Sequence, residues 1–335
     1  MSDSSVSAAW RRLTSQTVKH DVYAAEPYMA RAWSEAVEQF GDQAAWILQR
    51  TAAALFRPDA IVAARLHGAI GYIEDRLGLV PVFCAPVDFT EQSAELVWKY
   101  QWGGASADRI ALMKSMLTSA PSVLVAFRDP RARIELPASV RLSAVKGSGH
   151  PAERAGHELR SALGSPNRVL TFVHITDEPA DILREAAILL PPAERRRMFA
   201  ALRDDGAPLD RRLLPGGSAG ISLDGREALE RILARVAAAP VADPAAPARE
   251  RLVAALEAAA RGSRLDWIAF RRGLDECDIR LPLWDQLVAG AAYIDYDNVM
   301  DRAIIPNSGY RGWLDAAGLV LADPYPAPRR PRDAG

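Results

Sequence analysis

Apolar side chains recur at helical spacing near the start of the chain, within residues 22–49. Such periodicity indicates a helix with one apolar face. Gly41 interrupts the pattern, which resumes over residues 44–48. We therefore predict a helical N-terminal extension over residues 1–50. The large apolar residues at this spacing are Tyr23, Met29, Trp33, Val37 and Phe40.

Strand-like apolar runs and helical patterns alternate in the next part of the chain, and this alternation defines a predicted middle domain over residues 51–190. Residues 128–166 are expected to be rich in loops. The predicted strands are residues 52–56, 79–87, 121–127 and 168–174. The predicted helices are residues 61–77, which Gly78 ends, 107–117, 177–190 and a segment after Thr90, a favourable N-cap.

The composition changes after Pro191 and Pro192, which break the pattern. Residues 191–248 are first rich in arginine and then in alanine and proline, which is typical of a connector; a short helix is predicted over 226–238. Two further helical patterns indicate a small helical C-terminal module over residues 249–325. Residues 326–335 are expected to form a basic tail. The two helical patterns cover residues 249–261 and 283–292.

The charge balance excludes a strong overall attraction to polyanions. Lys and Arg number 41 and Asp and Glu number 42, so the net charge is −1. Such a chain has no whole-molecule field that would draw it to nucleic acid or to an anionic membrane. The sequence also lacks an apolar run of about 20 residues or the apolar core of a signal peptide. Its two cysteines, Cys84 and Cys277, give no disulfide framework and fit a cytoplasmic location.

His174 is the first candidate for chemistry. It ends an apolar run and precedes a helix start at Thr176-Asp177-Glu178-Pro179. Junctions between a strand and a helix often display functional side chains, and helix N-termini attract anions. The alternative is a structural histidine, which is common at such a position.

Arginines near predicted loops and element ends strengthen the case for an anionic ligand. Guanidinium groups stay charged and can bind phosphate oxygens through two parallel hydrogen bonds. The alternative interpretation is a solvated basic surface. These arginines are Arg57, Arg109, Arg141, Arg160 and Arg168.

The order and spacing of several short segments resemble those of nucleoside diphosphate kinases over residues 51–190. The resemblance implies a ferredoxin-like α/β (α+β) fold, in which helices cover a four-stranded antiparallel sheet. The segments that carry it are Arg57-Pro58-Asp59, Ser119-Ala120-Pro121-Ser122-Val123, Gly147-Ser148-Gly149-His150-Pro151, Leu159-Arg160 and Val173-His174-Ile175-Thr176-Asp177.

The resemblance also implies a chemistry. His174 matches the nucleophile that takes a phosphoryl group from a nucleoside triphosphate and gives it to a nucleoside diphosphate. Glu185 matches the glutamate that holds the other ring nitrogen, and Tyr100, or alternatively Trp102, matches a tyrosine near the nucleophile. Magnesium is expected to arrive with the nucleotide, without a metal site in the protein. The implied phosphate-binding residues are Arg57, Arg109, Arg141, Arg160 and Thr171.

Several positions depart from the family pattern. Arg57 stands where the family has lysine, and we expect it to take over that phosphate contact; Ala60 replaces a glycine and Thr171 an asparagine. Ile110 or Leu112 falls where the family stacks the nucleotide base. These departures leave two alternatives open: a related phosphotransferase with a specialised non-nucleotide acceptor, and a non-catalytic nucleotide-binding regulatory module. Whether the protein forms a homo-oligomer also stays open.

Two other groups of polar residues are assigned no chemistry. His150 and His157 lack partners at metal-ligand spacing and are interpreted as loop residues. Asp295, Asp297 and Asp301 are interpreted as helix caps and surface residues, because the glycine and the final glutamate of a calcium-binding loop are missing.

Overall fold

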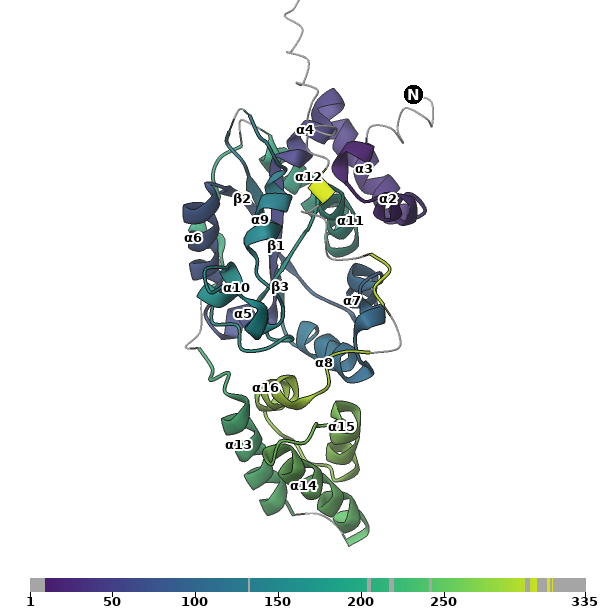
Figure 1. Ribbon diagram of the computed structural model, residues 1–335, viewed down its shortest axis with the longest axis vertical. Coiled ribbons are helices and arrows are strands. Elements are labelled where there is room, and N and C mark those ends of the chain that lie inside the picture. The colour runs from purple at the N-terminus through teal and green to yellow at the C-terminus, as the bar shows by residue number, and fades with distance from the viewer. Residues whose placement is uncertain are drawn as a thin grey trace, which may run out of the picture.

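An antiparallel sheet of four strands lies at the centre of the described part of the protein (Figure 1). The computed structural model describes residues 10–131, 133–203, 206–216, 220–240, 243–298, 302–305, 312, 313 and 315. The strand order is β2-β3-β1-β4, which confirms the predicted fold class. The predicted tail, residues 326–335, lies outside the described residues. The strands are β1 (Thr51–Phe56), β2 (Val80–Val87), β3 (Ser122–Arg128) and β4 (Val173–Ile175).

The central strand β1 is buried on both faces. Because successive side chains of a strand point to opposite faces, β1 contributes to two separate cores. Ala52, Ala54 and Phe56 enter one core, and Ala53 and Leu55 enter the other. A continuous apolar run is therefore what this position in the fold requires.

Helices cover both faces of the sheet (Figure 1). Within the N-terminal extension, α2 packs beside α3, and the interruption at Gly41 separates α3 from α4. One face carries α5 (Pro58–Val62), α6 (Leu66–Leu77), α9 (Ala138–Val145) and α10 (Leu159–Ala162). The other side carries α2 (Thr17–Ala24), α3 (Pro27–Phe40), α4 (Ala44–Gln49), α11 (Pro179–Leu189) and α12 (Pro192–Leu202).

Two helices, α7 and α8, connect β2 to β3, and the C-terminal helices α15 and α16 pack against α8 (Figure 1). Gly290 allows the close approach of α16: a Cβ at this position would lie 2.4 Å from Leu112 of α8 and 2.8 Å from Trp267 of α15. The helices are α7 (Glu91–Trp98), α8 (Ala107–Leu117), α13 (Gly225–Ala238), α14 (Ala246–Ala260), α15 (Trp267–Glu276) and α16 (Leu283–Tyr293).

Local backbone conformation explains where the predicted elements differ from the observed ones. Phe172 has φ of 65°, which a strand does not tolerate, so the strand predicted over 168–174 begins only at Val173. Ala64, with φ of 55°, separates α5 from α6 within the predicted helix 61–77. The predicted N-cap Thr90 is confirmed: its hydroxyl accepts from the Ser93 amide at 3.0 Å.

Three helical regions were not predicted. Residues 128–166, expected to be loop-rich, contain α9 and α10, the predicted connector contains α12, and α15 was also missed. These elements are short, so too few turns exist for a period of 3.6 residues to stand out. In the described part of the chain, none of the helices is both long and apolar enough for a bilayer crossing.

Candidate active site

A polar cavity of about 610 Å³ lies beside β4. Segments distant in sequence form its wall: the end of α7, the start of α8, the loop after α9 and the chain after α16. Five cationic side chains line it, against three carboxylates. The cations are Arg57, Arg109, Lys146, Arg160 and Arg168, and the carboxylates are Glu153, Asp177 and Asp297.

His174 and Glu185 meet at the edge of this cavity. Val173 and Ile175 enter the core beneath α5 and α6, so His174, between them, projects from the opposite face of β4 towards α11. Its Nε2 lies 2.9 Å from each carboxylate oxygen of Glu185, which is buried. A carboxylate can only accept, so Nε2 carries the proton and Nδ1 presents its lone pair. The structure thus brings together the two residues that the sequence paired.

Tryptophans, not Tyr100, provide the aromatic wall beside His174. Trp98 meets the imidazole edge-on at 5.1 Å between ring centroids, and Trp98 stacks with Trp102 at 6.1 Å. The Tyr100 hydroxyl instead donates to Glu26 at 2.7 Å, away from the cavity. Burial and Glu26 raise the pKa of Tyr100 to about 12. The predicted role of Tyr100 is therefore corrected: Trp102, the alternative, lines the cavity, as does Trp98, which was missed.

Arg160 is held by the backbone and by no acidic side chain. Its two terminal nitrogens donate to the carbonyls of Gly147 at 3.0 Å and Val173 at 3.2 Å, and its Nε is buried without a hydrogen-bond partner among the described residues. Burial and the guanidinium groups of Arg57 and Arg154 lower the pKa of Arg160 to about 9, which still leaves it charged at neutral pH. No described carboxylate forms an ion pair with it, so an anion in the cavity would satisfy this charge.

Arg57 lines the cavity but is already partly neutralised. Its Nη2 donates to Asp59 at 2.9 Å and to the Val169 carbonyl at 2.6 Å. The same Asp59 oxygen also accepts from the Phe172 amide at 2.8 Å, so the ion pair fixes the bend before β4. That Arg57 replaces the lysine of the family in binding phosphate stays a prediction; the structure gives it a second, structural task.

The remaining predicted phosphate ligands separate into two groups. Arg109 and Thr171 line the cavity. Arg141 does not: its guanidinium donates to Asp129 at 2.7 Å and to the Leu77 carbonyl at 2.8 Å. Asp129 stands just after β3, and this buried carboxylate holds Arg141 away from the site. Its assignment as a phosphate ligand is therefore corrected to a structural role.

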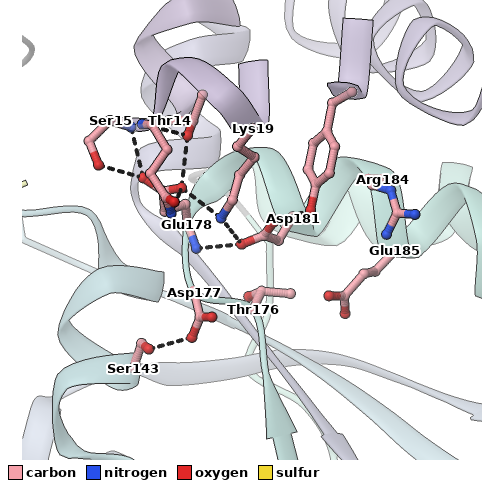
Figure 2. A network of polar contacts seen from close by, with 12 residues as sticks. Thr14, Ser15, Lys19, Ser143, Thr176, Asp177, Glu178, Asp181, Arg184 and Glu185 are labelled. Atoms are coloured by element: carbon pink, nitrogen blue, oxygen red, sulfur yellow. Dashed lines mark hydrogen bonds and ion pairs between the residues drawn. The ribbon is translucent and has the colours of Figure 1, made fainter. Parts of the chain in front are cut away.

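Five charged residues that line the cavity were given no role from the sequence, namely Lys146, Glu153, Arg168, Asp177 and Asp297. Lys146, at the end of α9, pairs with Asp177 at 2.8 Å. Ser143 donates to the same carboxylate at 2.6 Å (Figure 2). These contacts, the lysine foremost, hold the pKa of Asp177 well below its usual range although burial opposes this. Arg168, noted in the sequence without a role, and Asp297, interpreted as a surface residue, complete the set. Lys146 stands directly before Gly147-Ser148-Gly149, and this neighbourhood was the available signal.

The comparisons with known proteins find a likeness in solved structures alone. No family model matches the chain, and no curated protein does. A nucleoside diphosphate kinase family protein from Babesia bovis is 14% identical, with 43% of this chain and 90% of that chain covered and a TM-score of 0.35. The nucleoside diphosphate kinase of Aquifex aeolicus is 18% identical, with 43% and 97% covered and a TM-score of 0.34. The likeness is a distant one of fold, over part of the chain.

Proposed function

We propose that this protein transfers a phosphoryl group from a nucleoside triphosphate, through a phosphohistidine at His174, to a nucleoside diphosphate. One observation carries the proposal: an imidazole fixed by both oxygens of the buried Glu185 stands at the edge of a cavity with five cations. Fixed tautomer and surplus positive charge are the two properties that phosphorylation of a histidine requires.

In the proposed reaction each ring nitrogen of His174 has its own role, and the contact of Nε2 with Glu185 supports this division. Nδ1 of His174 attacks the terminal phosphorus, the bond from that phosphorus to the bridging oxygen breaks, and the diphosphate leaves with the bonding electrons. The ring then carries a positive charge, which the Glu185 carboxylate stabilises through the proton on Nε2. In the second half, a terminal oxygen of the acceptor diphosphate attacks the same phosphorus and Nδ1 regains its lone pair.

The cavity fits magnesium as part of the substrate. Its carboxylates already have protein partners, namely Lys146 for Asp177, Arg168 for Asp297 and Ser148 for Glu153. Among the described residues, no group of three or more His, Cys, Asp or Glu side chains could hold a metal ion. Magnesium held by the phosphate oxygens would add positive charge at the transferring group, beside that of Arg160.

Incubation with magnesium and ATP is expected to add one phosphate to the intact protein. Mass spectrometry under alkaline conditions, which preserve phosphohistidine, should locate it on His174, and His174→Ala should lose it. Addition of a nucleoside diphosphate should then remove the phosphate. A phosphate on another residue alone, or none with any common nucleoside triphosphate, contradicts the proposal.

A specialised acceptor is the second candidate, and the C-terminal helices favour it. Leu112 is fully buried, because α16 packs on it through Gly290. Leu112 therefore offers no surface for stacking a nucleotide base, whereas Ile110, the other position named for it, is half-buried. An acceptor screen with the phosphorylated protein distinguishes the candidates: only nucleoside diphosphates discharge His174 in the first, and only smaller hydroxyl or phosphate compounds do so in the second.

Arg160→Ala is expected to weaken triphosphate binding by about 1–3 kcal/mol, the scale of a charge-assisted hydrogen bond. The reason is that Arg160 donates only to backbone carbonyls and has no acidic partner among the described residues, so its charge is available to a bound anion. Titration calorimetry with a non-hydrolysable ATP analogue measures the change. Arg141→Ala is the matched control, since Asp129 holds this arginine outside the cavity. The Arg141→Ala variant should bind the ATP analogue as tightly as the parent does. Equal effects of the two substitutions would remove Arg160 from the site.

A further inference from the structure

The chain that follows α16 closes one side of the cavity. We call residues 294–298 and 302–305 the closing segment. The amide of Ser106 donates to the Tyr296 carbonyl at 3.1 Å, and the amide of Asn298 donates to the Gly104 carbonyl at 3.1 Å. The amides of Ile304 and Ile305 donate to the Tyr100 carbonyl at 2.8 and 3.2 Å. These backbone bonds lay the closing segment along residues 100–106, between α7 and α8.

This arrangement places one carboxylate on two arginines of the cavity. Both oxygens of Asp297 pair with the guanidinium of Arg168, one of them at 2.7 Å, and Asp297 lies 3.7 Å from Arg109. A carboxylate bound by both terminal nitrogens of an arginine occupies the positions that two phosphate oxygens would take. Bonding to Arg168 lowers the pKa of Asp297, so it is anionic at neutral pH.

The ion pair between Asp297 and Arg168 is one that a competing anion can displace. The Asp297 side chain is 51% exposed, so solvent screens its ion pair with Arg168 and the pair contributes little to stability. Arg168 keeps a second support, because its guanidinium lies 5.4 Å from the centre of the Tyr296 ring. This aromatic contact does not depend on the carboxylate of Asp297.

We propose that Asp297 is a specificity-determining residue, which holds Arg168 and Arg109 as an internal substitute for a phosphate and so limits the negative charge that the cavity accepts. This rests on the proposed function in placing phosphates in the cavity. A single phosphate needs only the arginine without an acidic partner, Arg160. A polyphosphate extends to Arg168 and Arg109 and must displace the carboxylate. Asp297 therefore lowers affinity more for longer polyphosphates.

Titration calorimetry with inorganic orthophosphate and tripolyphosphate tests this. Asp297→Asn keeps the size of the side chain and removes its charge. We expect tripolyphosphate to bind about 5-fold more tightly, a change of ~1 kcal/mol, and the affinity for orthophosphate to change less than about 2-fold. Asp295→Asn is the matched control, because Asp295 lies in the same segment, is 70% exposed and pairs with Arg264 outside the cavity. The double variant Asp297→Asn/Arg168→Ala should lose the gain, since Arg168 is the group released.

Unchanged or weaker tripolyphosphate binding in Asp297→Asn, or an equal gain in Asp295→Asn, overturns the inference. So does a gain that survives removal of Arg168. These titrations need no phosphorylation of His174, so the two proposals fail separately. If the protein never becomes phosphorylated but Asp297→Asn binds tripolyphosphate more tightly, the inference holds and the proposed function fails. If His174 becomes phosphorylated but Asp297→Asn shows no such gain, the proposed function holds and the inference fails.

Discussion

Glu178→Ala is expected to lower the free energy of unfolding by about 3–5 kcal/mol, the scale for removing one partner of a buried ion pair. Glu178 is fully buried at the N-cap of α11, and Lys19 of α2 lies 2.6 Å away (Figure 2). Its oxygens also accept from the Thr14 hydroxyl at 2.8 Å, the Ser15 amide at 2.7 Å and the Trp313 indole at 2.7 Å. Without Glu178, these donors lose their acceptor, and the buried ammonium of Lys19 keeps only Asp181, at 2.9 Å.

Equilibrium denaturation measures this change, and its pH dependence identifies the cause. Although burial opposes it, Lys19 and the hydrogen bonds from Ser15 lower the pKa of Glu178. A lowered pKa contributes stability that is present above the unfolded value, about 4.3, and is lost as the pH falls through the lower folded value. The difference in free energy of unfolding between the parent and Glu178→Ala should therefore become smaller as the pH falls. The pKa of Lys19 is raised, mainly by Asp181 and Glu178 against the effect of burial, so its contribution is present below about 10.4 and is lost only at higher pH.

Glu257→Ala is the matched control for this prediction. Glu257 lies on α14, where it pairs with Arg261 one helical turn away, and its side chain is 50% exposed. Substitutions at such positions change stability by about 0.5 kcal/mol or less. A loss below about 1 kcal/mol for Glu178→Ala, or the same loss for both variants, would show that the buried network does not stabilise the fold.

Glu185→Gln is expected to slow phosphorylation of His174 about 100-fold while leaving the denaturation midpoint unchanged. The magnitude is that of a positioned acid–base group. Glutamine retains an oxygen that can accept from Nε2, but it lacks the charge that stabilises the cationic ring, and its amide can also present a donor. Single-turnover labelling with radioactive ATP gives the rate.

A second readout separates positioning from general damage. Nitrogen NMR of the His174 ring distinguishes its tautomers, and the parent should carry its proton on Nε2. In Glu185→Gln we expect a mixture of tautomers. Glu194→Gln, on the neighbouring helix α12 and paired with Arg197 at the surface, should leave both the rate and the tautomer as in the parent. An unchanged rate in Glu185→Gln would remove Glu185 from the mechanism.

The sequence by itself determined the sheet and the centre of the candidate site. Strand β1 is a continuous apolar run because both its faces are buried, and such a run is visible without a structure. His174 and Glu185 are joined by one strand end, one turn and the first seven residues of α11. The sequence paired these two residues only through the resemblance, and local backbone geometry over this short separation allows them to meet.

The sequence could not show which aromatic residue at the end of α7 faces His174. Trp98 and Tyr100 stand two positions apart, which on a helix corresponds to opposite sides, and both are aromatic. Packing of α7 turned Trp98 towards His174 and buried Tyr100 against Glu26. Likewise Arg141 and Arg160 are equivalent in type, and only the position of Asp129 removed Arg141 from the cavity.

Tertiary structure alone decided the contacts between distant segments. Asp297 pairs with Arg168 across 129 positions, and Thr14 pairs with Glu178 across 164. Backbone preferences act over a few residues, whereas these contacts depend on which apolar faces pack together, α16 on α8 and α3 on α11. Polar side chains on the packed elements then meet as a consequence. For that reason His174 and Glu185 could be matched from the chain through the resemblance, while the residues that close the cavity and anchor the N-terminal helices could not.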